Sequence, residues 1–262
     1  MALFNQHVKA KKFLGQHFLK DLQIAKDIAD ALSIDPPQRK IIEVGPGMGV
    51  LTQYLIEKPF DLKVVELDRD SVAYLKEHFP ALEGRIIEGD FLKLPLNELL
   101  DEHGGVIGNF PYNISSQILF HCLDYKEHVL EIVGMFQKEV AERIAAPHGK
   151  KDYGIISVLL QTYYKTEYLF TVHEHVFNPP PKVKSAVVRL TRKEDVQLPV
   201  DYSFFRNVVK TAFNQRRKTL RNALKPILMG VSLDHPFMDL RAEQLSVDDF
   251  AQLALFIHDQ QK

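Results

Sequence analysis

Short apolar runs and longer amphipathic stretches alternate through the first two-thirds of the chain. The runs are rich in β-branched residues and end at Gly, Asp or Asn, as buried strands commonly do. We expect strands over Ile41–Gly45, Lys63–Leu67, Arg85–Gly89, Gly105–Phe110 and Val129–Phe136. The stretches between them predict helices over Val50–Glu57, Ser71–Phe79 and Ser115–Leu123, and Asp21 is placed to cap an earlier helix. This alternation predicts an α/β fold with a parallel sheet and helices on both faces.

The strand pattern ends with Ser185–Thr191, and the charged segment Arg192–Pro199 follows it as a candidate linker. The remaining pattern is purely helical, over Tyr202–Phe213, Lys218–Leu228 and Ser246–Ile257. The last of these helices opens with Ser246-x-x-Asp249, the spacing of a capping box. The sequence therefore predicts a large α/β domain over residues 1–194 and a small all-helical domain over residues 195–262.

Composition agrees with a globular protein that has a sizeable core. The chain has 262 residues, of which 45% are hydrophobic and 26% charged. Its single cysteine, Cys122, excludes an intramolecular disulfide and favours a reducing compartment; its place on an apolar helix face indicates a core residue. No apolar run has the length of a membrane span, and the first twenty residues lack a signal-peptide core. We expect a cytoplasmic monomer with no membrane partner.

The charges are unevenly distributed although the net charge is only −1. Lys182–Lys225 contains twelve basic and three acidic residues, and the first twenty residues hold Lys9, Lys11, Lys12 and Lys20 without an acid. A basic stretch on an otherwise acidic chain is typical of a surface that binds a polyanion such as RNA. The alternative is a set of solvated helix faces that happen to be basic.

Three of the predicted strands end in residues suited to one ligand. The first runs into Gly45-Pro46-Gly47-Met48-Gly49, where glycines at a strand-to-helix turn allow close approach of the backbone to a ligand. That turn alone also fits a nicotinamide site. The second strand ends at Glu66, which can accept from both hydroxyls of a ribose. The third is followed by Asp90, which can accept from an adenine amine. Together they fit a cofactor that contains adenosine.

The fourth strand ends in Asn109-Phe110-Pro111-Tyr112, which indicates a reaction at an aromatic amine. Such an amine is a poor nucleophile because its lone pair is delocalised into the ring. Acceptance of its two hydrogens by the Asn109 oxygen and a backbone carbonyl would favour a tetrahedral nitrogen and free that lone pair. Pro111 would fix the turn, and Tyr112 could stack on a base that has left its helix.

The chain also resembles a known family, the ribosomal small-subunit RNA adenine dimethyltransferases. The resemblance spans nearly the whole sequence. Besides the strand-end motifs, it is carried by three runs: Lys12-Phe13-Leu14-Gly15-Gln16-His17-Phe18-Leu19, the segment from Phe177-Asn178-Pro179-Pro180-Pro181-Lys182 to Val188, and Ala212-Phe213-Asn214-Gln215-Arg216-Arg217-Lys218-Thr219-Leu220-Arg221. His17 departs from the pattern, since many relatives carry Asn there.

The resemblance implies a Rossmann-like methyltransferase domain that uses S-adenosylmethionine, followed by a helical domain that binds RNA. It implies dimethylation of two adjacent adenines in a hairpin loop of a partly assembled small ribosomal subunit. The implied cofactor contacts are His17, Leu19, Gly45, Gly47, Glu66, Asp90 and Asn109. The implied catalytic and base-stacking residues are Asn109, Pro111, Tyr112 and Phe177, and the implied RNA contacts are Arg216, Arg217, Lys218 and Arg221.

Three other functions compete with this interpretation. A large-subunit RNA methyltransferase of the macrolide-resistance type is disfavoured by the Phe177–Lys182 segment and the run Arg216–Arg221. The intact Asn109–Tyr112 motif argues against a non-catalytic RNA-binding factor, and the chain shows no inserted target-recognition domain of a DNA adenine methylase. We expect no metal: a neutral thioether leaves in methyl transfer, and His173 and His175 have no further ligands nearby in the sequence.

Overall fold

The computed structural model describes residue 8 and residues 10–33, 35, 39–228 and 234–261. Lys9, one of the four N-terminal lysines, lies outside these residues. The chain divides into two compact units. The first comprises Met1–Ala141 and Glu167–Arg192, and the second comprises Glu142–Thr166 and Lys193–Lys262.

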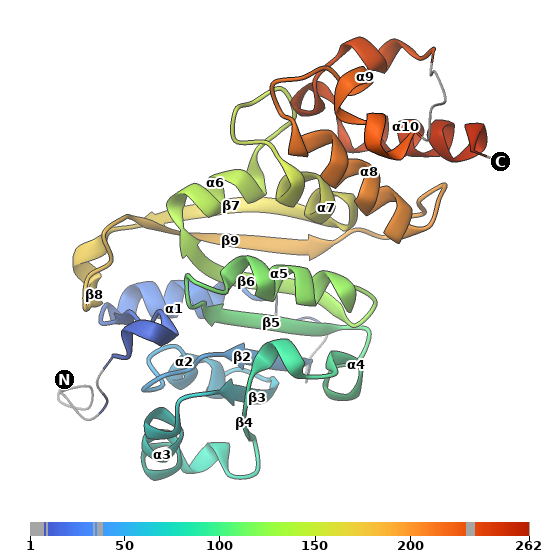
Figure 1. The fold of residues 1–262 in the computed structure, drawn as a ribbon. Coiled ribbons are helices and arrows are strands. Elements are labelled where there is room, and N and C mark those ends of the chain that lie inside the picture. The colour runs from blue at the N-terminus through green and yellow to red at the C-terminus, as the bar shows by residue number, and fades with distance from the viewer. Residues whose placement is uncertain (1–7, 9, 34, 36–38, 229–233, 262) are drawn as a thin grey trace. The chain divides into compact units, whose positions relative to one another are not determined.

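The main sheet has seven strands in the order β4-β3-β2-β5-β6-β9-β7 (Figure 1). Their bounds are β2 (Lys40–Val44), β3 (Asp61–Glu66), β4 (Ile86–Glu88), β5 (Gly104–Asn109), β6 (Val129–Gln137), β7 (Tyr164–Val172) and β9 (Ser185–Arg192). The five strands from β4 to β6 pair in parallel, whereas β9 runs antiparallel to β6. The predicted α/β class is confirmed, but the sequence pattern did not reveal the antiparallel pairing or the strand β7.

Burial explains why the parallel strands read as continuous apolar runs. Ile132 and Val133 of β6 are neighbours whose side chains point to opposite faces of the sheet, and both are fully buried. The same holds for Val106 and Ile107 of β5. Both faces of the sheet centre are therefore covered, as parallel sheets require.

The helices of the first unit are α1 (Leu22–Asp30), α2 (Thr52–Ile56), α3 (Arg69–His78), α4 (Leu96–Leu99) and α5 (Ser115–Asp124). Helices α2, α3 and α5 lie close to the predicted helices, α1 follows the predicted cap, and α4 was not predicted. Asp21 caps α1 as predicted, because its Oδ1 accepts from the N–H groups of Gln23 and Ile24 at 2.9 and 3.1 Å. Helix α3 packs on β3 and β4, and α5 packs on β6.

A separate two-stranded antiparallel sheet joins β1 (Phe18–Leu19) to β8 (Phe177–Asn178). A 3₁₀ turn, η1 (Lys12–Leu14), precedes β1, and η4 (Glu174–Val176) precedes β8. The other 3₁₀ turns are η2 (Pro80–Leu82), η3 (Phe91–Lys93), η5 (Lys225–Ile227), η6 (Pro236–Asp239) and η7 (Ala242–Gln244). The small sheet fixes the N-terminal segment beside residues that follow it by about 160 positions in the sequence.

The second unit is helical. It includes Glu142–Thr166, which the predicted boundary at residue 194 assigns to the α/β domain. Helix α7 (Ile155–Tyr163) packs against α8 (Tyr202–Asn214) and α10 (Val247–Gln260). Its apolar side chains Val158, Leu159 and Leu160 are all fully buried. The division of the chain after Ala141 falls within helix α6 (Lys138–Ala145). The division at Lys193 falls within the predicted linker.

The predicted capping box of α10 is present, but one predicted helix is wrong. The Ser246 hydroxyl accepts from the Asp249 N–H at 3.1 Å, and the Asp249 carboxylate accepts from the Ser246 N–H at 2.9 Å. The expected helix over Lys218–Leu228 is instead a short α9 (Leu220–Ala223) followed by η5. Pro226 lies in η5; proline has no N–H to donate and clashes with the preceding turn of a helix. Among the described residues, no helix is both long and apolar enough to span a membrane.

Candidate functional site

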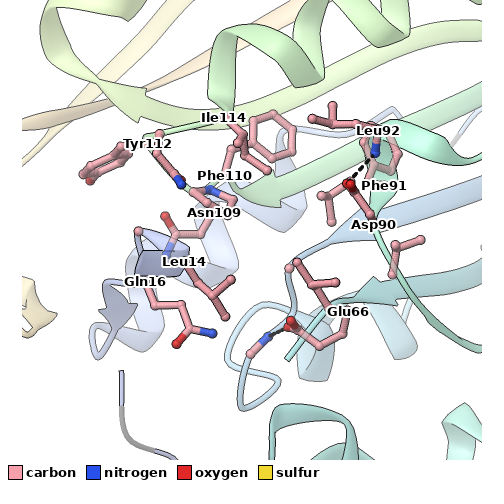
Figure 2. A pocket seen from close by; sticks show the side chains of 18 of the residues that line it. Leu14, Gln16, Glu66, Asp90, Phe91, Leu92, Asn109, Phe110, Tyr112 and Ile114 are labelled. Atoms are coloured by element: carbon pink, nitrogen blue, oxygen red, sulfur yellow. Dashed lines mark hydrogen bonds between the residues drawn. The ribbon is translucent and has the colours of Figure 1, made fainter. Parts of the chain in front are cut away.

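The carboxyl ends of four neighbouring strands surround a cavity of about 320 Å³. Such edges are where ligands bind in open α/β sheets, and the volume suits a small organic molecule. Eight of the residues predicted to act in the site line this cavity: His17, Gly45, Gly47, Glu66, Asp90, Asn109, Pro111 and Tyr112. Figure 2 shows Glu66, Asp90 and Asn109 around it, with Leu14 and Gln16 of the N-terminal segment beside them.

The glycine-rich turn after β2 forms one wall of the cavity. Gly45 and Gly47 have φ angles of +67° and +56°, which side chains disfavour, so glycine is strongly favoured at both positions. The Gly45 N–H donates to the Val65 carbonyl at 2.9 Å, which ties the turn to β3. A ligand can therefore approach the bare backbone of this turn closely.

Glu66, at the end of β3, lies at the back of the cavity with only 5% of its surface exposed. Its Oε2 accepts from the Gly47 N–H at 3.0 Å, and its Oε1 accepts from the Asp68 N–H at 2.9 Å. Burial raises the pKa of this carboxyl above its ordinary value, and the two N–H donors partly oppose that effect. A carboxylate oxygen can accept two hydrogen bonds, so each oxygen retains capacity for a donor from a ligand.

Asp90 occupies the next strand end and begins η3. Its Oδ1 accepts from the Leu92 N–H at 3.0 Å, which leaves Oδ2 to accept from a ligand. Lys93 has a largely exposed side chain, and its Nζ lies 3.9 Å from Asp90 Oδ2. The buried ring of Phe91 and the side chain of Leu92 line the cavity next to Asp90, so a flat apolar ring with a donor at its edge would fit here.

Tight packing below the fourth strand end fixes the turn Asn109–Tyr112. Phe110 is 1% exposed and meets the ring of Phe136 edge-on, with centroids 5.3 Å apart. A Cβ added at Gly134 would lie 2.3 Å from the Phe110 ring, so only glycine leaves room for that ring. The turn that follows β5 is thereby held against the sheet.

The amide of Asn109 has a defined orientation. Its Nδ2 donates to the main-chain carbonyl of His17 at 2.9 Å. The reverse orientation would place Oδ1 against the carbonyl oxygen, and two acceptors repel each other. The side-chain oxygen of Asn109 therefore points away from His17 and can accept from a ligand amine.

Tyr112 is held at both its hydroxyl and its ring. The hydroxyl is hydrogen-bonded to Ser185 Oγ, and burial raises the pKa of this phenol. The ring stacks against the His17 imidazole with centroids 5.4 Å apart and an interplanar angle of 27°. The imidazole is fixed in turn, because its Nδ1 lies 2.8 Å from the Pro179 carbonyl and must donate to it. Tyr112 thus offers a rigid aromatic surface at the cavity.

Two predicted site residues do not line this cavity. Leu19 and Phe177 are register partners in the β1–β8 sheet, and both side chains pack in the hydrophobic core, at 5% and 1% exposure. Leu19 borders a small adjoining cavity of about 30 Å³. The expected contact of Phe177 with a target base therefore has no support in this geometry, since pairing with β1 turns its ring into the core.

The four predicted RNA contacts lie in the second unit and differ in their environments. Arg216 donates from Nη2 to the main-chain carbonyls of Lys151 and Tyr153, the latter at 3.0 Å, so it anchors a loop. Arg221 pairs with Asp239 at 3.1 Å. Arg217 and Lys218 are exposed in the turn after α8. Of the four, these two are best placed to contact a phosphate backbone.

Sequence reasoning missed three residues that hold the predicted ones in place. They are Gln16, Asp68 and Ser185, of which Gln16 and Ser185 lie within quoted motifs. Asp68 follows Glu66 by two residues, and only its position after a strand end could have drawn attention to it. Within the described part of the chain, no three His, Cys, Asp or Glu side chains gather as a metal site would require. The absence of a metal remains a prediction.

Comparison with known proteins places these residues in a family context. The model of the ribosomal RNA adenine dimethylase family matches residues 7–259. The chain is 62% identical over 250 residues to a protein of Phocaeicola vulgatus named ribosomal RNA small subunit methyltransferase A, which covers 94% of this chain and 89% of that protein. A protein of the same name from Cytophaga hutchinsonii is 58% identical, with coverage of 95% and 97%.

The fold is shared with solved structures, two of which cover most of this chain. A dimethyladenosine transferase from Plasmodium falciparum is similar with a TM-score of 0.77 and 25% identity, over 94% of this chain and 98% of that one. The 23S rRNA methyltransferase ErmE gives a TM-score of 0.66 at 22% identity, over 90% and 98%. The likeness to ErmE supports the fold alone.

Proposed function

The chain belongs to the ribosomal RNA adenine dimethylase family, and from that premise we propose how its site works. The protein is an S-adenosylmethionine-dependent methyltransferase that acts on the exocyclic amine of adenine in ribosomal RNA. Its substrate is a pair of adjacent adenines in a small-subunit RNA hairpin, and its product is dimethyladenosine made during ribosome biogenesis. The proteins named small subunit methyltransferase A, at 62% and 58% identity, support this branch over the large-subunit one.

The residues of the cavity fit S-adenosylmethionine. Glu66 can accept from the two ribose hydroxyls, and Asp90 Oδ2 can accept from the adenine amine beside Phe91 and Leu92. Gly45 and Gly47 leave the backbone bare for the rest of the molecule. When bound, S-adenosylmethionine supplies an electrophilic methyl group whose departure leaves a neutral thioether.

Asn109 is the residue that promotes attack on that methyl group. Its Oδ1 accepts a hydrogen from the target amine, and a main-chain carbonyl of the same turn accepts the second. Both bonds strengthen as the nitrogen becomes tetrahedral and positive, so they lower the barrier more than they raise affinity. Tyr112 stacks on the target base, and the methylated amine loses its proton without a strong base. The orientation of the Asn109 amide, fixed by the His17 carbonyl, is the observation that carries this mechanism.

The proposed partner is the small-subunit RNA within a partly assembled subunit, contacted through Arg217 and Lys218 of the second unit. We propose that the protein works as a cytoplasmic monomer in two functional parts. Residues 1–194 carry out catalysis, and residues 195–262 bind RNA.

The test of the mechanism is single-turnover methyl transfer to immature small subunits at saturating S-adenosylmethionine. Loss of one transition-state hydrogen bond predicts that Asn109→Ala slows the reaction on the order of 10²–10³-fold. Asn97→Ala, an exposed residue of α4, is the matched control and should retain the wild-type rate. An Asn109→Ala enzyme within about threefold of wild type would exclude the proposed role and favour a non-catalytic RNA-binding protein.

The substrate is tested separately in cells. Mass mapping of ribosomal RNA with and without the gene should show two adjacent dimethyladenosines of the small subunit that disappear with the gene. Loss of a large-subunit modification instead would assign the chain to the other branch.

A further inference from the structure

Residues 14–17 of the segment Lys11–His17 line the cavity, and Lys11 and Gln16 tie this segment to Asp68, two residues beyond Glu66. Asp68 is only 2% exposed. Its carboxylate accepts from Lys11 Nζ and from Gln16 Nε2, the latter at 3.1 Å. The Lys11 N–H also donates to Gln16 Oε1 at 2.8 Å, which closes the segment into a loop around Asp68. A buried carboxylate thus holds two side chains of one short segment.

The same segment carries the carbonyl that orients Asn109. His17 follows Gln16 directly, and its main-chain oxygen accepts from Asn109 Nδ2 at 2.9 Å. The terminal torsion of an asparagine is broad and roughly two-fold, so nothing intrinsic to the residue prevents rotation of the amide. The position of the His17 carbonyl decides which amide atom faces the cavity.

We propose that Asp68 is a positioning residue for methyl transfer, which acts by holding Lys11 and Gln16 so that the His17 carbonyl keeps the Asn109 oxygen directed at the target amine. The proposal rests on the function given above for Asn109. It assigns to Asp68 no contact with cofactor or RNA. It also connects the two halves of the site, because the Asp68 N–H donates to Glu66, the residue proposed to hold the cofactor ribose.

The charge state of Asp68 suits this role. Burial alone would raise the pKa of its carboxyl, but the hydrogen bonds from Lys11, Gln16 and the Asp70 N–H, together with the Lys11 charge, outweigh burial and hold the pKa below its usual value. Asp68 is therefore a carboxylate at neutral pH. Further donors are the Asp70 N–H at 3.2 Å and the Ser71 hydroxyl at 3.4 Å, which fix the carboxylate from its own helix.

The first experiment compares Asp68→Asn with Asp70→Asn in single-turnover methyl transfer at saturating S-adenosylmethionine. Asp70 is a matched control because it also lies near Lys11, at 2.7 Å, but its side chain is 65% exposed. A displacement of the order of 1 Å at a reacting group can cost 10²-fold in rate. We expect Asp68→Asn to slow the reaction by roughly 10- to 100-fold and Asp70→Asn to stay within about threefold. An Asp68→Asn enzyme at the wild-type rate would overturn the proposal.

The second experiment asks whether Asp68 acts through Asn109. In an Asn109→Ala background there is no amide left to orient, so Asp68→Asn should cost less than about threefold further. Equal losses in both backgrounds would show that Asp68 acts independently and would overturn the proposal. If Asn109→Ala itself is harmless, the proposed mechanism fails, but the positioning can still be measured directly.

That direct measurement is the NMR signal of the Asn109 side-chain amide, which does not depend on activity. The wild-type protein should show a hydrogen-bonded amide in slow exchange, and Asp68→Asn should shift or broaden that signal while Asp70→Asn does not. Lys11→Met, which breaks the same tie from the exposed side, should reproduce the effect if Asp68→Asn folds poorly. An unchanged Asn109 signal in both variants would overturn the proposal.

Discussion

Replacement of Glu66 by alanine tests the cofactor site and the local fold together. In the folded protein its two oxygens accept from the N–H groups of Gly47 and Asp68, at 3.0 and 2.9 Å. The remaining lone pairs are proposed to accept from two ribose hydroxyls. Charge-assisted bonds of that kind contribute roughly 1.5–3 kcal/mol each. Since about 1.4 kcal/mol corresponds to tenfold, Glu66→Ala should weaken S-adenosylmethionine binding at least tenfold.

The same substitution should also destabilise the free protein. Each N–H that loses a buried acceptor costs about 1–3 kcal/mol, so the free energy of unfolding should fall by about 2 kcal/mol or more. Calorimetry gives the dissociation constant, and denaturant unfolding without cofactor gives the stability. Glu88→Ala is the matched control, because Glu88 is the register partner of Glu66 on β4 and is exposed. An unchanged dissociation constant for Glu66→Ala would remove Glu66 from the cofactor site.

Three further predictions concern other parts of the molecule. Burial raises the pKa of Glu43 to about 8, so the folded state keeps a proton that the unfolded chain releases above about 4.5. The free energy of unfolding should therefore fall with rising pH across that window, by up to about 1.4 kcal/mol per pH unit. Denaturant unfolding at several pH values measures this dependence, which should be weaker in Glu43→Gln. Neutralising Arg217 and Lys218 should weaken RNA binding and flatten the salt dependence of the binding constant by roughly one counterion per lost contact, which a salt titration measures. Arg216→Gln should mainly lower the melting temperature, which a thermal scan measures. An unchanged salt dependence in the variant without Arg217 and Lys218 would contradict their contact with the RNA backbone. Phe177→Ala should cost about 3–5 kcal/mol of unfolding free energy, and a variant with wild-type stability and a selective loss of base binding would contradict its place in the core.

Much of the site could be predicted because it lies at strand ends, where sequence patterns are most informative. Gly45, Glu66, Asp90 and Asn109 each follow an apolar run, and parallel pairing brings those ends to one edge of the sheet. Side-chain chemistry at each position then suggested its role. The prediction of a small-subunit RNA substrate came from the family resemblance, because the chemistry of these residues does not distinguish one RNA from another.

The parts that were missed depend on contacts between distant segments. The amino-acid sequence gives no sign that the main-chain carbonyl of His17 accepts a hydrogen bond from Asn109, which lies ninety-two positions later. The stacking role of Phe177 was expected only from the family resemblance, and no sequence pattern indicated its pairing with Leu19 or its place in the core. The prediction of a helix over Lys218–Leu228, by contrast, was wrong for a local reason, because Pro226 interrupts the helix.

The carbonyl that orients Asn109 belongs to the main chain, and this has an evolutionary consequence. Substitution at position 17 changes the side chain but not the acceptor, so a relative with Asn there can keep the same amide orientation. Under the proposed mechanism, position 109 has no such freedom, because its side chain has to donate to the His17 carbonyl and accept from the target amine. Aspartate has the same shape, but it would place a negatively charged oxygen next to the carbonyl oxygen of His17, and the two would repel each other. The site can thus tolerate variation on one side of this hydrogen bond, while the other side stays constrained to a side chain that both donates and accepts.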